Sequence, residues 1–159
     1  MSLREYRTKR NFHATPEPKP KTRTAKDRKT SDLIYIIQRH QARRLHWDLR
    51  LEENGVLKSW AVPKEPPAEE GVRRLAVNVE DHTLEYADFE GTIPDGEYGA
   101  GKVEIWDKGS YQPLEMSSAK KVFEIHGKKL NGTYCLIKLK VQDPKDKNWL
   151  FFKLKDKTK

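Results

Sequence analysis

Three polar residues of the segment RLHWDLRL occupy every second position. His46, Asp48 and Arg50 lie two apart, with apolar residues between them. Alternate side chains of a β-strand project from opposite faces, so these three would share one face of a sheet. His40 ends the preceding apolar run, and a hairpin between the two runs would bring its imidazole near His46 and Asp48. Two imidazoles and a carboxylate are a usual ligand set for Mn²⁺, Fe²⁺ or Zn²⁺.

Arg50 has a different chemical use, because a guanidinium offers no lone pair to a metal. It can bind a phosphate through two parallel hydrogen bonds. Metal ligands beside a phosphate clamp predict metal-assisted attack on a phosphoester. A solvated strand with an Asp48–Arg50 ion pair is the simpler alternative. Other residues could also bind a metal or a phosphate, but on pattern alone they are ordinary surface residues: His13, Lys64, Arg74, His82 and His126.

Short apolar runs separated by turns follow Leu33 and would form the strands that position these residues. The runs cover residues 33–40, 44–52, 56–62, 73–80, 102–107, 110–114, 121–127, 133–141 and 149–155. Turn signals occur at Asn54-Gly55, Lys108-Gly109 and Asn131-Gly132. Glycines 91, 96, 99 and 101 could offer backbone N–H groups to a phosphate, although a wide structural turn is favoured. The pattern predicts an all-β protein, an antiparallel β-barrel or sandwich of about eight short strands.

The basic charge of the chain is concentrated before Asp32. Residues 1–30 hold ten Lys and Arg and three acids, a net +7 out of +8 for all 159 residues. Almost nothing in this segment could be buried, so we expect a disordered basic arm at 1–31 and a folded domain at 32–159. A basic arm favours a polyanionic partner, most simply nucleic acid, and a solubilising tail is the alternative.

The single cysteine and the absence of long apolar runs bear on the compartment. Cys135 has no partner for an intrachain disulfide, and no run approaches the roughly 18 apolar residues of a membrane span. The N-terminus also lacks the apolar segment of a signal peptide. These features predict a soluble, cytoplasmic protein with no membrane partner.

A longer string of motifs carries a resemblance to a known family. The run IIQRHQARRLHWDLRLEENGVLKSWAVPKEPP, followed by RLAVNVEDHTLEYADFEGTIPDGEYGAGKVEIWDKGSY, resembles the 3′-phosphoesterase domain of DNA ligase D. The resemblance is close over residues 33–113 and looser through WLFFKLK. It implies a prokaryotic, nucleoid-associated β-barrel enzyme that heals DNA 3′ ends in non-homologous end joining. Such an enzyme removes a 3′-terminal ribonucleotide to leave a 3′-phosphate, and then removes that phosphate to leave a 3′-hydroxyl.

The resemblance also implies roles for individual residues. It implies manganese as the preferred metal, with Co²⁺ or Zn²⁺ as other candidates, held by His40, His46 and Asp48. Arg50 and His82 would contact the scissile phosphate. The remaining implied positions are Tyr86 as a further catalytic residue and Gln38, Lys64 and Arg74 as supporting substrate-binding residues.

The implied partners are nucleic acid and other repair proteins. The substrates would be DNA or RNA/DNA-tipped 3′ ends of primer–templates. No polymerase or adenylate-transfer motif is present, so the chain is identified as a stand-alone member that would work with a separate DNA ligase or end-joining factor.

The mechanism expected from these residues rests on charge. The metal would polarise a phosphate oxygen, Arg50 would stabilise charge at phosphorus, and a protonated His82 could bind phosphate or protonate the leaving oxygen. Water and a neighbouring 2′-hydroxyl both remain as nucleophiles for the ribonucleotide step.

Two other functional classes use similar residues. One is a non-haem Fe(II) oxygenase with His46, Asp48 and either His82 or His126 as ligands. That triad has no need of His40, and the motif string also argues against it. The other is a non-catalytic DNA-binding module in which the His/Asp group is structural.

Overall fold

Nine strands and two short helical elements make up the described part of the chain, residues 3–12, 14–18 and 32–155 of the computed structural model. They are α1 (Leu3–Thr8), β1 (Leu33–Gln41), β2 (Leu45–Glu53), β3 (Val56–Val62), β4 (Arg73–His82), η2 (Leu84–Asp88), β5 (Gly91–Ile93), β6 (Gly101–Met116), β7 (Lys120–His126), β8 (Asn131–Lys138) and β9 (Asn148–Lys153). Strands β1 to β4 follow the predicted runs to within two residues at each end. None of the helices within the described ranges is long and apolar enough to cross a membrane.

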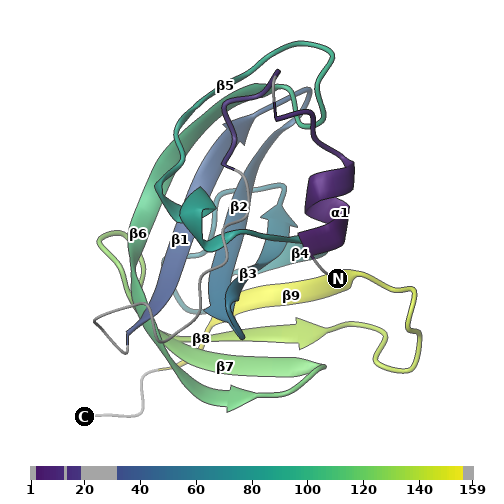
Figure 1. Cartoon of the computed structure of the whole chain (residues 1–159). Helices are drawn as coiled ribbons and strands as arrows, with labels where there is room; N and C mark the ends of the chain where they lie inside the picture. The colour runs from purple at the N-terminus through teal and green to yellow at the C-terminus, as the bar shows by residue number, and fades with distance from the viewer. Residues whose placement is uncertain (1–2, 13, 19–31, 156–159) are drawn as a thin grey trace.

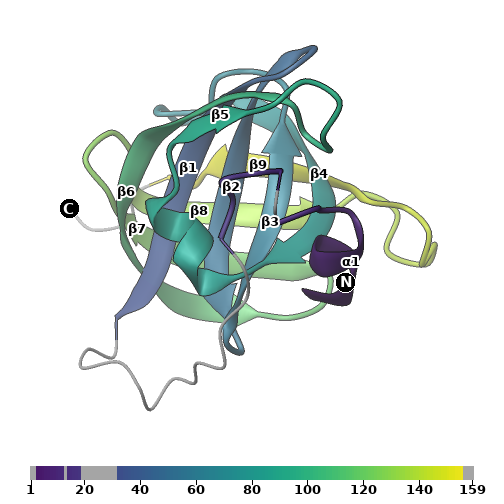
Figure 2. The ribbon, with the colours of Figure 1, turned by 45° about the horizontal axis from the view of Figure 1, so that its top comes forward.

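The strands close into a barrel (Figures 1 and 2). Neighbours run in the order β1-β2-β3-β4-β9-β8-β7-β6, and β6 pairs back onto β1, so eight antiparallel strands form a ring. β5 is an additional short strand beside the start of β6. Closure leaves the eight strands of the ring without a free edge. The prediction of an all-β antiparallel barrel is confirmed.

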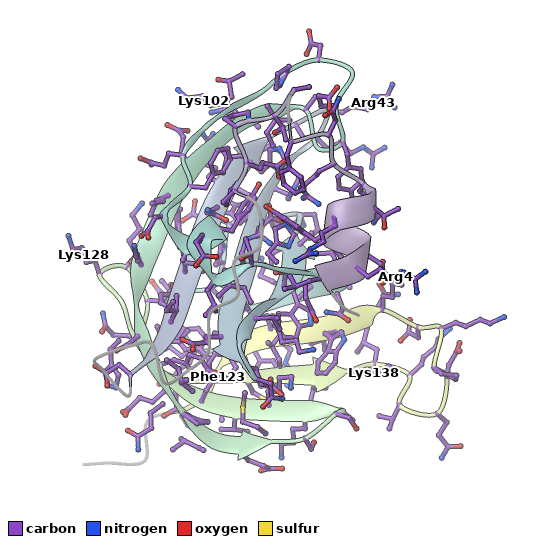
Figure 3. The ribbon with its side chains drawn as sticks, in the orientation of Figure 1. Arg4, Arg43, Lys102, Phe123, Lys128 and Lys138 are labelled. Atoms are coloured by element: carbon purple, nitrogen blue, oxygen red, sulfur yellow. The ribbon has the colours of Figure 1, made fainter. Side chains whose placement is uncertain are left out.

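The inner face of the wall carries the main hydrophobic core. Every strand of the ring contributes to it, through residues such as Leu49 of β2, Phe123 of β7 and Phe151 of β9. Figure 3 shows Phe123 toward one end of the barrel, while Arg43 and Lys102 lie at the other end. Burial of this apolar face fixes the register of the strands, because a slip of one residue would turn the core residues outward.

The outer face of the wall has a second, smaller cluster. Ile36 of β1 and Leu57 of β3 pack there against Tyr6 of α1, Tyr86 of η2 and Ile93 of β5. Figures 1 and 2 show α1 and the segment after β4 lying over the β1–β4 part of the wall. These elements form a cover over one side of the barrel.

Part of the predicted basic arm belongs to this cover. Tyr6 is fully buried, and its hydroxyl donates a hydrogen bond to the carbonyl oxygen of Pro18 at 2.5 Å. The expectation that almost nothing before Asp32 is buried is therefore wrong for residues 3–12 and 14–18. One aromatic anchor and a set of ion pairs, described below, hold this segment despite its low apolar content. Residues 19–31 of the predicted arm lie outside the described residues.

The turn prediction at Lys108-Gly109 is wrong, whereas the one at Asn54-Gly55 is right. Asn54 and Gly55 have φ angles of 54° and 83°, as the tight hairpin between β2 and β3 requires. Lys108 and Gly109 instead lie inside the sixteen residues of β6. A Cβ at Gly109 would stand 2.0 Å from the carbonyl oxygen of His126 on β7. Glycine is needed at position 109 because two backbones approach closely, and not because the chain turns.

The turn prediction at Asn131-Gly132 is also wrong, because both residues already pair with β7 as the first residues of β8. The turn occupies residues 127–130 and is held by the buried carboxylate of Asp107. That carboxylate accepts hydrogen bonds from the backbone N–H groups of the three residues 128, 129 and 130 at 2.8–3.0 Å. Contacts between residues 21 to 23 positions apart in the sequence therefore override the local turn signal.

Candidate metal and phosphate site

His40, His46 and Asp48 come together on the outer face of the β1–β2 hairpin. The strand register places His40 directly opposite His46. Nδ1 of His40 lies 3.6 Å from one carboxylate oxygen of Asp48, and Nε2 of His46 lies 3.3 Å from the other. One candidate ligand atom from each residue lies within 4.8 Å of the other two, and no other such group occurs among the described residues.

Backbone carbonyl groups fix the orientation of both imidazoles. Nε2 of His40 donates to the carbonyl oxygen of Gly99 at 2.7 Å, and Nδ1 of His46 donates to that of Arg44 at 3.1 Å. The other nitrogen of each ring faces Asp48, where it either holds a proton that is hydrogen-bonded to the carboxylate or, in the neutral ring, offers its lone pair to a metal. Metal-ligating histidines are oriented by hydrogen bonds of this kind. The donor set therefore fits a divalent metal.

Two glycines bring the loop between β5 and β6 against these ligands. Gly99 has a φ of +77°, which favours glycine, and its carbonyl contacts His40. A Cβ at Gly101 would lie 2.2 Å from the carbonyl oxygen of Gln41, at the end of β1. The glycine-rich loop thus has the structural role that the sequence favoured.

Arg50 of β2 is held by acceptors on both neighbouring strands and on its own strand. Its Nε donates to Oε1 of Gln38 at 2.7 Å, one terminal nitrogen donates to Oγ of Ser59 at 2.9 Å, and the other lies 3.4 Å from Asp48. The guanidinium also lies over the ring of Tyr86, 4.7 Å from its centroid. A buried guanidinium fixed on several sides has few side-chain conformations to lose when it binds a phosphate.

Gln38 connects the cover to the strand face, the outer face of β1 and β2 that carries His40, His46, Asp48 and Arg50. Its amide nitrogen donates to the carbonyl oxygens of Tyr86 and Phe89 at 2.8 and 3.0 Å, while its oxygen accepts from Arg50. All of its strong hydrogen-bonding groups are therefore used within the protein. Gln38 can orient Arg50, but it has no N–H directed at a ligand.

Asp48 is ionised although it is buried. Burial alone would raise its pKa, but the positive charge of Arg50 and the hydrogen bonds to His40 and His46 hold the pKa well below its usual range. For His46, burial lowers the pKa, and the hydrogen bond and charge of Asp48 raise it above the ordinary value. A metal at this position would compete with a proton for His46, so its binding would depend on pH.

His82 lies in the same pocket but is neutral. Burial, together with the charges of Arg50 and Arg10, lowers its pKa well below the ordinary value. Its Nδ1 donates to the carbonyl oxygen of Glu80 at 3.0 Å, so Nε2 accepts from Arg10 at 3.3 Å. In this state the ring has no second proton to give, so the protonated His82 of the sequence-based mechanism is disfavoured.

Tyr86 closes the inner side of the pocket from η2. Its ring stands edge-on to His82, with centroids 4.6 Å apart, and its hydroxyl donates to Glu17 at 2.8 Å. Burial, and to a smaller extent the charge of Glu17, raises the pKa of Tyr86 well above its usual value. Tyr86 is therefore a phenol that can donate a hydrogen bond and not a phenolate.

Three charged residues of the pocket were missed by the sequence analysis: Arg10, Glu17 and Glu80. The Arg10 guanidinium bonds Glu17 at 2.8 Å and Glu80 at 3.2 Å, and all three side chains are almost fully buried. The guanidinium also lies over the ring of Tyr6, 4.0 Å from its centroid. Nothing in the local pattern marks Arg10 among the ten basic residues of the arm. The only available signals were the two nearby aromatic residues, Tyr6 and Phe12.

Three predicted site residues do not line the pocket: Gln38, which bonds the lining residue Arg50, and also Lys64 and Arg74. Lys64 is exposed in the loop after β3, and Arg74 of β4 donates to the backbone carbonyl of the neighbouring Glu65 at 2.7 Å. His126, a ligand of the alternative oxygenase site, is exposed at the end of β7 and paired with Glu124. Neither His82 nor His126 joins the cluster of possible metal ligands, whose third member is His40.

The pocket that these residues enclose has a volume of about 290 Å³. Its lining consists of Arg10, Glu17, His40, Ala42, His46, Asp48, Arg50, Ala61, Val79, Glu80, His82, Tyr86, Ile93, Tyr98 and Gly99. Two guanidinium groups face three carboxylates, which leaves one net negative charge when the imidazoles are neutral. A divalent cation would reverse that sign, and a phosphate would then be attracted to the pocket.

Comparison with known proteins places this geometry in a family. Residues 38–138 match the family described as DNA Ligase D 3′-phosphoesterase domain. The multifunctional non-homologous end joining protein LigD of Pseudomonas aeruginosa is 48% identical over 161 residues, which cover 97% of this chain and 19% of that protein. The proteins of the same name from Mycolicibacterium smegmatis and Mycobacterium bovis are 46% and 45% identical, again over 97% of this chain.

The pairwise matches cover 97% of the chain, so they include most of the N-terminal segment that precedes the family match at residue 38. The chain spans about a fifth of the length of these curated relatives. The length of the family match and the level of identity together show that the chain belongs to the DNA ligase D 3′-phosphoesterase domain family.

Proposed function

We propose that this protein is a metal-dependent phosphoesterase that heals DNA 3′ ends. It would remove a 3′-terminal ribonucleotide to leave a 3′-phosphate, and then remove that phosphate to leave a 3′-hydroxyl. The observation that carries the proposal is the position of Arg50 beside the His40–His46–Asp48 group. A metal-ligand set and a guanidinium in one small pocket match the needs of phosphoester hydrolysis.

The metal would be held by His40 Nδ1, His46 Nε2 and the carboxylate of Asp48. A bound Mn²⁺, or another divalent ion such as Co²⁺ or Zn²⁺, would supply Lewis-acid polarisation of the phosphate. The carboxylate contributes the only negative charge among the three ligands, so it matters most for holding a dication.

The guanidinium groups would bind and stabilise the phosphate. Arg50 of β2 is anchored by Gln38 and Ser59, and Arg10 of the N-terminal segment, which lines the same pocket, is anchored by Glu17 and Glu80. Donors fixed before the reaction stabilise the charge that builds on phosphate oxygens without first having to reorganise. Two such groups, one from the strand face and one from the N-terminal segment, would also orient the phosphorus for attack.

His82 is suited to accept or relay a proton beside the phosphate. In the monoester step, the oxygen of a water molecule bonds to phosphorus and the bond from phosphorus to the 3′-oxygen breaks. The 3′-oxygen takes a proton from His82, and the released phosphate keeps the two protons of the water. A phosphate dianion next to His82 would raise the low pKa of the ring, because an adjacent opposite charge favours the protonated form. The substrate itself would thereby prepare His82 to donate that proton.

The product suggests the context of the reaction. The relatives named above are multifunctional non-homologous end joining proteins. A 3′-hydroxyl is the group that a ligation or extension reaction needs. We therefore place the activity before ligation in double-strand break repair, with a DNA ligase or another end-joining factor as its partner.

The decisive experiment measures phosphate release from a DNA primer–template with a 3′-phosphate. We expect release in the presence of Mn²⁺, none in EDTA, and none with Asp48→Ala. The same DNA carrying its phosphate at the 5′ end is the matched control. Tight binding without any phosphate release would contradict the proposal and favour a non-catalytic DNA-binding module.

A second experiment tests the substrate range. A primer ending in one ribonucleotide should give first a 3′-phosphate and then a 3′-hydroxyl, whereas an all-deoxy 3′-hydroxyl end should resist. Rapid shortening of the all-deoxy end would instead indicate a general exonuclease.

The basic residues 19–31 are proposed to hold duplex DNA near the pocket. Six Lys and Arg lie there: Lys19, Lys21, Arg23, Lys26, Arg28 and Lys29. Changing all six to Gln should lower the affinity for DNA and flatten its salt dependence, since each lost phosphate contact removes about 0.9 from the log–log slope. Turnover at saturating DNA should persist, because the pocket is intact. An unchanged slope and affinity would show that these charges only solubilise the protein.

A further inference from the structure

Tyr98 stands out at the mouth of the pocket. It lines the cavity, yet 45% of it is exposed, which makes it one of the few large aromatic side chains open to solvent. It belongs to the loop between β5 and β6 and contacts Lys9 and Arg10 of the N-terminal segment. Figures 1 and 2 show that loop running beside the N-terminal segment. The next residue, Gly99, holds the metal-ligand candidate His40 through its carbonyl oxygen. Tyr98 is thus adjacent in sequence to the residue that orients a candidate metal ligand.

The position of the ring is fixed by its neighbours. Its hydroxyl lies 3.5 Å from Glu80 and 3.4 Å from the ammonium nitrogen of Lys9. Lys9 and Arg10 also lie over the ring, 4.8 and 5.3 Å from its centroid. Gly96 and Gly99, with φ angles of +90° and +77°, shape the loop on either side of it. These contacts hold an exposed aromatic surface in place, and the hydrophobic effect alone would not keep it there.

The size of the pocket indicates what this surface is for. At about 290 Å³, the cavity is at the lower limit for small-molecule sites. A phosphate between Arg50 and Arg10 and its attached sugar would fill it. The base of the same nucleotide must then lie at the mouth, where Tyr98 presents its ring.

We infer that Tyr98 is a substrate-binding residue that stacks on the base of the nucleotide carrying the reacting phosphate. The inference rests on the proposed function and extends it from the phosphate to the base. Stacking on an aromatic ring tolerates any base, because every base has a π face. Tyr98 would therefore favour an intact terminal nucleotide over an abasic one without selecting a sequence.

The test compares two 3′-phosphate primers that differ only in the terminal nucleotide, which either carries a base or is an abasic tetrahydrofuran residue. Wild-type protein should prefer the base-bearing primer, in kcat/KM and in affinity, by about 5- to 150-fold, the range expected for loss of one stacked base. Tyr98→Ala should lose this preference, and Tyr98→Phe and Tyr98→Trp should keep it. Leu114→Ala, which removes an exposed apolar side chain of β6, is the control and should keep it too.

Three outcomes would overturn the inference. In the first, the wild type shows no preference between the two primers. In the second, Tyr98→Ala weakens both primers by the same factor, which would make the ring a structural contact of the N-terminal segment. In the third, Tyr98→Phe loses as much as Tyr98→Ala, which would assign the effect to the hydroxyl and its contacts with Glu80 and Lys9.

Affinity for both primers is also measured in EDTA by fluorescence anisotropy. If the wild type releases no phosphate from either primer, the proposed function fails. The preference in affinity then still decides whether Tyr98 stacks on the base.

Discussion

The strand face and the cover of the pocket are built in different ways. His40, His46, Asp48 and Arg50 project from two paired strands whose opposite faces form the inner core of the barrel. The cover is an assembly of the N-terminal segment, η2 and the β5–β6 loop, held by the smaller outer cluster and by buried ion pairs. The strand face is rigid because the whole barrel supports it. The cover depends on a few contacts that each need a partner elsewhere in the chain.

This difference suggests a division of labour. The candidate metal ligands all belong to the strand face, and Arg50 lies beside them. Arg10, Glu17 and Tyr86 belong to the cover and complete the surroundings of the phosphate. Changes in the strand face should therefore affect metal binding, whereas changes in the cover should affect phosphate binding and turnover while metal binding persists.

The largest expected effect is that of Asp48→Ala. It removes the only charged ligand, and two neutral imidazoles cannot replace its charge. We expect loss of phosphate release by a factor on the order of 10³ or more, since metal polarisation supplies several kcal/mol of stabilisation. Titration with Mn²⁺ should show weakened binding, with Arg7→Ala on the exposed side of α1 as the control. Unaltered affinity for Mn²⁺ would contradict the ligand assignment.

The next effect is that of Arg50→Lys, which keeps the charge and removes the planar fork. A single ammonium nitrogen cannot reproduce the planar fork that reaches Gln38, Ser59 and a phosphate from separate nitrogens. We expect a loss of rate on the order of tenfold to a thousandfold, similar to the removal of one fixed donor at an oxyanion. Binding of Mn²⁺ should persist, because Arg50 is not a ligand. A variant with wild-type turnover would show that Arg50 is only a buried structural charge.

A smaller effect is expected when the cover is detached. Glu17→Gln weakens the contacts of Glu17 with Arg10 and Tyr86 and leaves a buried guanidinium with one charged partner fewer. We expect a loss of turnover of roughly 10- to 100-fold, comparable to that of residues that orient an active-site group. Affinity for Mn²⁺ should stay near that of the wild type.

The exposed Arg7 again supplies the control, as Arg7→Ala changes the same segment without touching the pocket. If Glu17→Gln weakened Mn²⁺ binding as much as Asp48→Ala does, the division between strand face and cover would not hold. Normal turnover in Glu17→Gln would show that the N-terminal segment has no part in the reaction.

The strand face was accessible to sequence reasoning because its pattern is local. Period-2 alternation around His46, Asp48 and Arg50 predicts one polar and one apolar face, and the hairpin places His40 opposite. The barrel follows from similar runs, and its closure from the β6–β1 pairing. The turn predictions at Gly109 and Gly132 failed for different reasons. At Gly109 two strand backbones approach closely, whereas before Gly132 the Asp107 carboxylate holds the turn at residues 127–130.

The cover could not be predicted from the sequence, because its contacts join residues far apart in the chain. Arg10 reaches Glu80 across 70 residues, and Tyr86 reaches Glu17 across 69. A buried ion pair of this kind leaves no periodic trace, and a segment rich in Lys, Arg and Pro has the composition of a disordered tail. The packing of Tyr6 against the outer cluster and the ion pairs of Arg10 show why part of it is ordered.

The last prediction concerns His82, which lies where the strand face and the cover meet. Its imidazole is surrounded by Arg10, Arg50, the rings of Tyr6 and Tyr86, and the backbone of Glu80, and its pKa is lowered well below the ordinary 6.5. The unfolded chain therefore binds a proton near pH 6.5 that the folded chain does not accept. Above pH 6.5 both states hold His82 neutral, so its titration does not lower the free energy of unfolding. That free energy falls as the pH drops from 6.5 toward the pKa of His82 in the folded protein. Down to pH 5 the cost is at most about 2 kcal/mol, at 1.4 kcal/mol per pH unit.

His82→Asn should remove this part of the pH dependence, because an amide does not titrate. Urea unfolding at pH 7 and pH 5, with EDTA present, should show a smaller loss of stability for the variant than for the wild type, whatever their stabilities at pH 7. His126→Asn, at an exposed ring far from the pocket, should leave the wild-type slope almost unchanged. Equal slopes for His82→Asn and the wild type would mean that the folded protein accepts a proton on His82. In that case burial and the charges of Arg10 on the cover and Arg50 on the strand face would not keep His82 neutral.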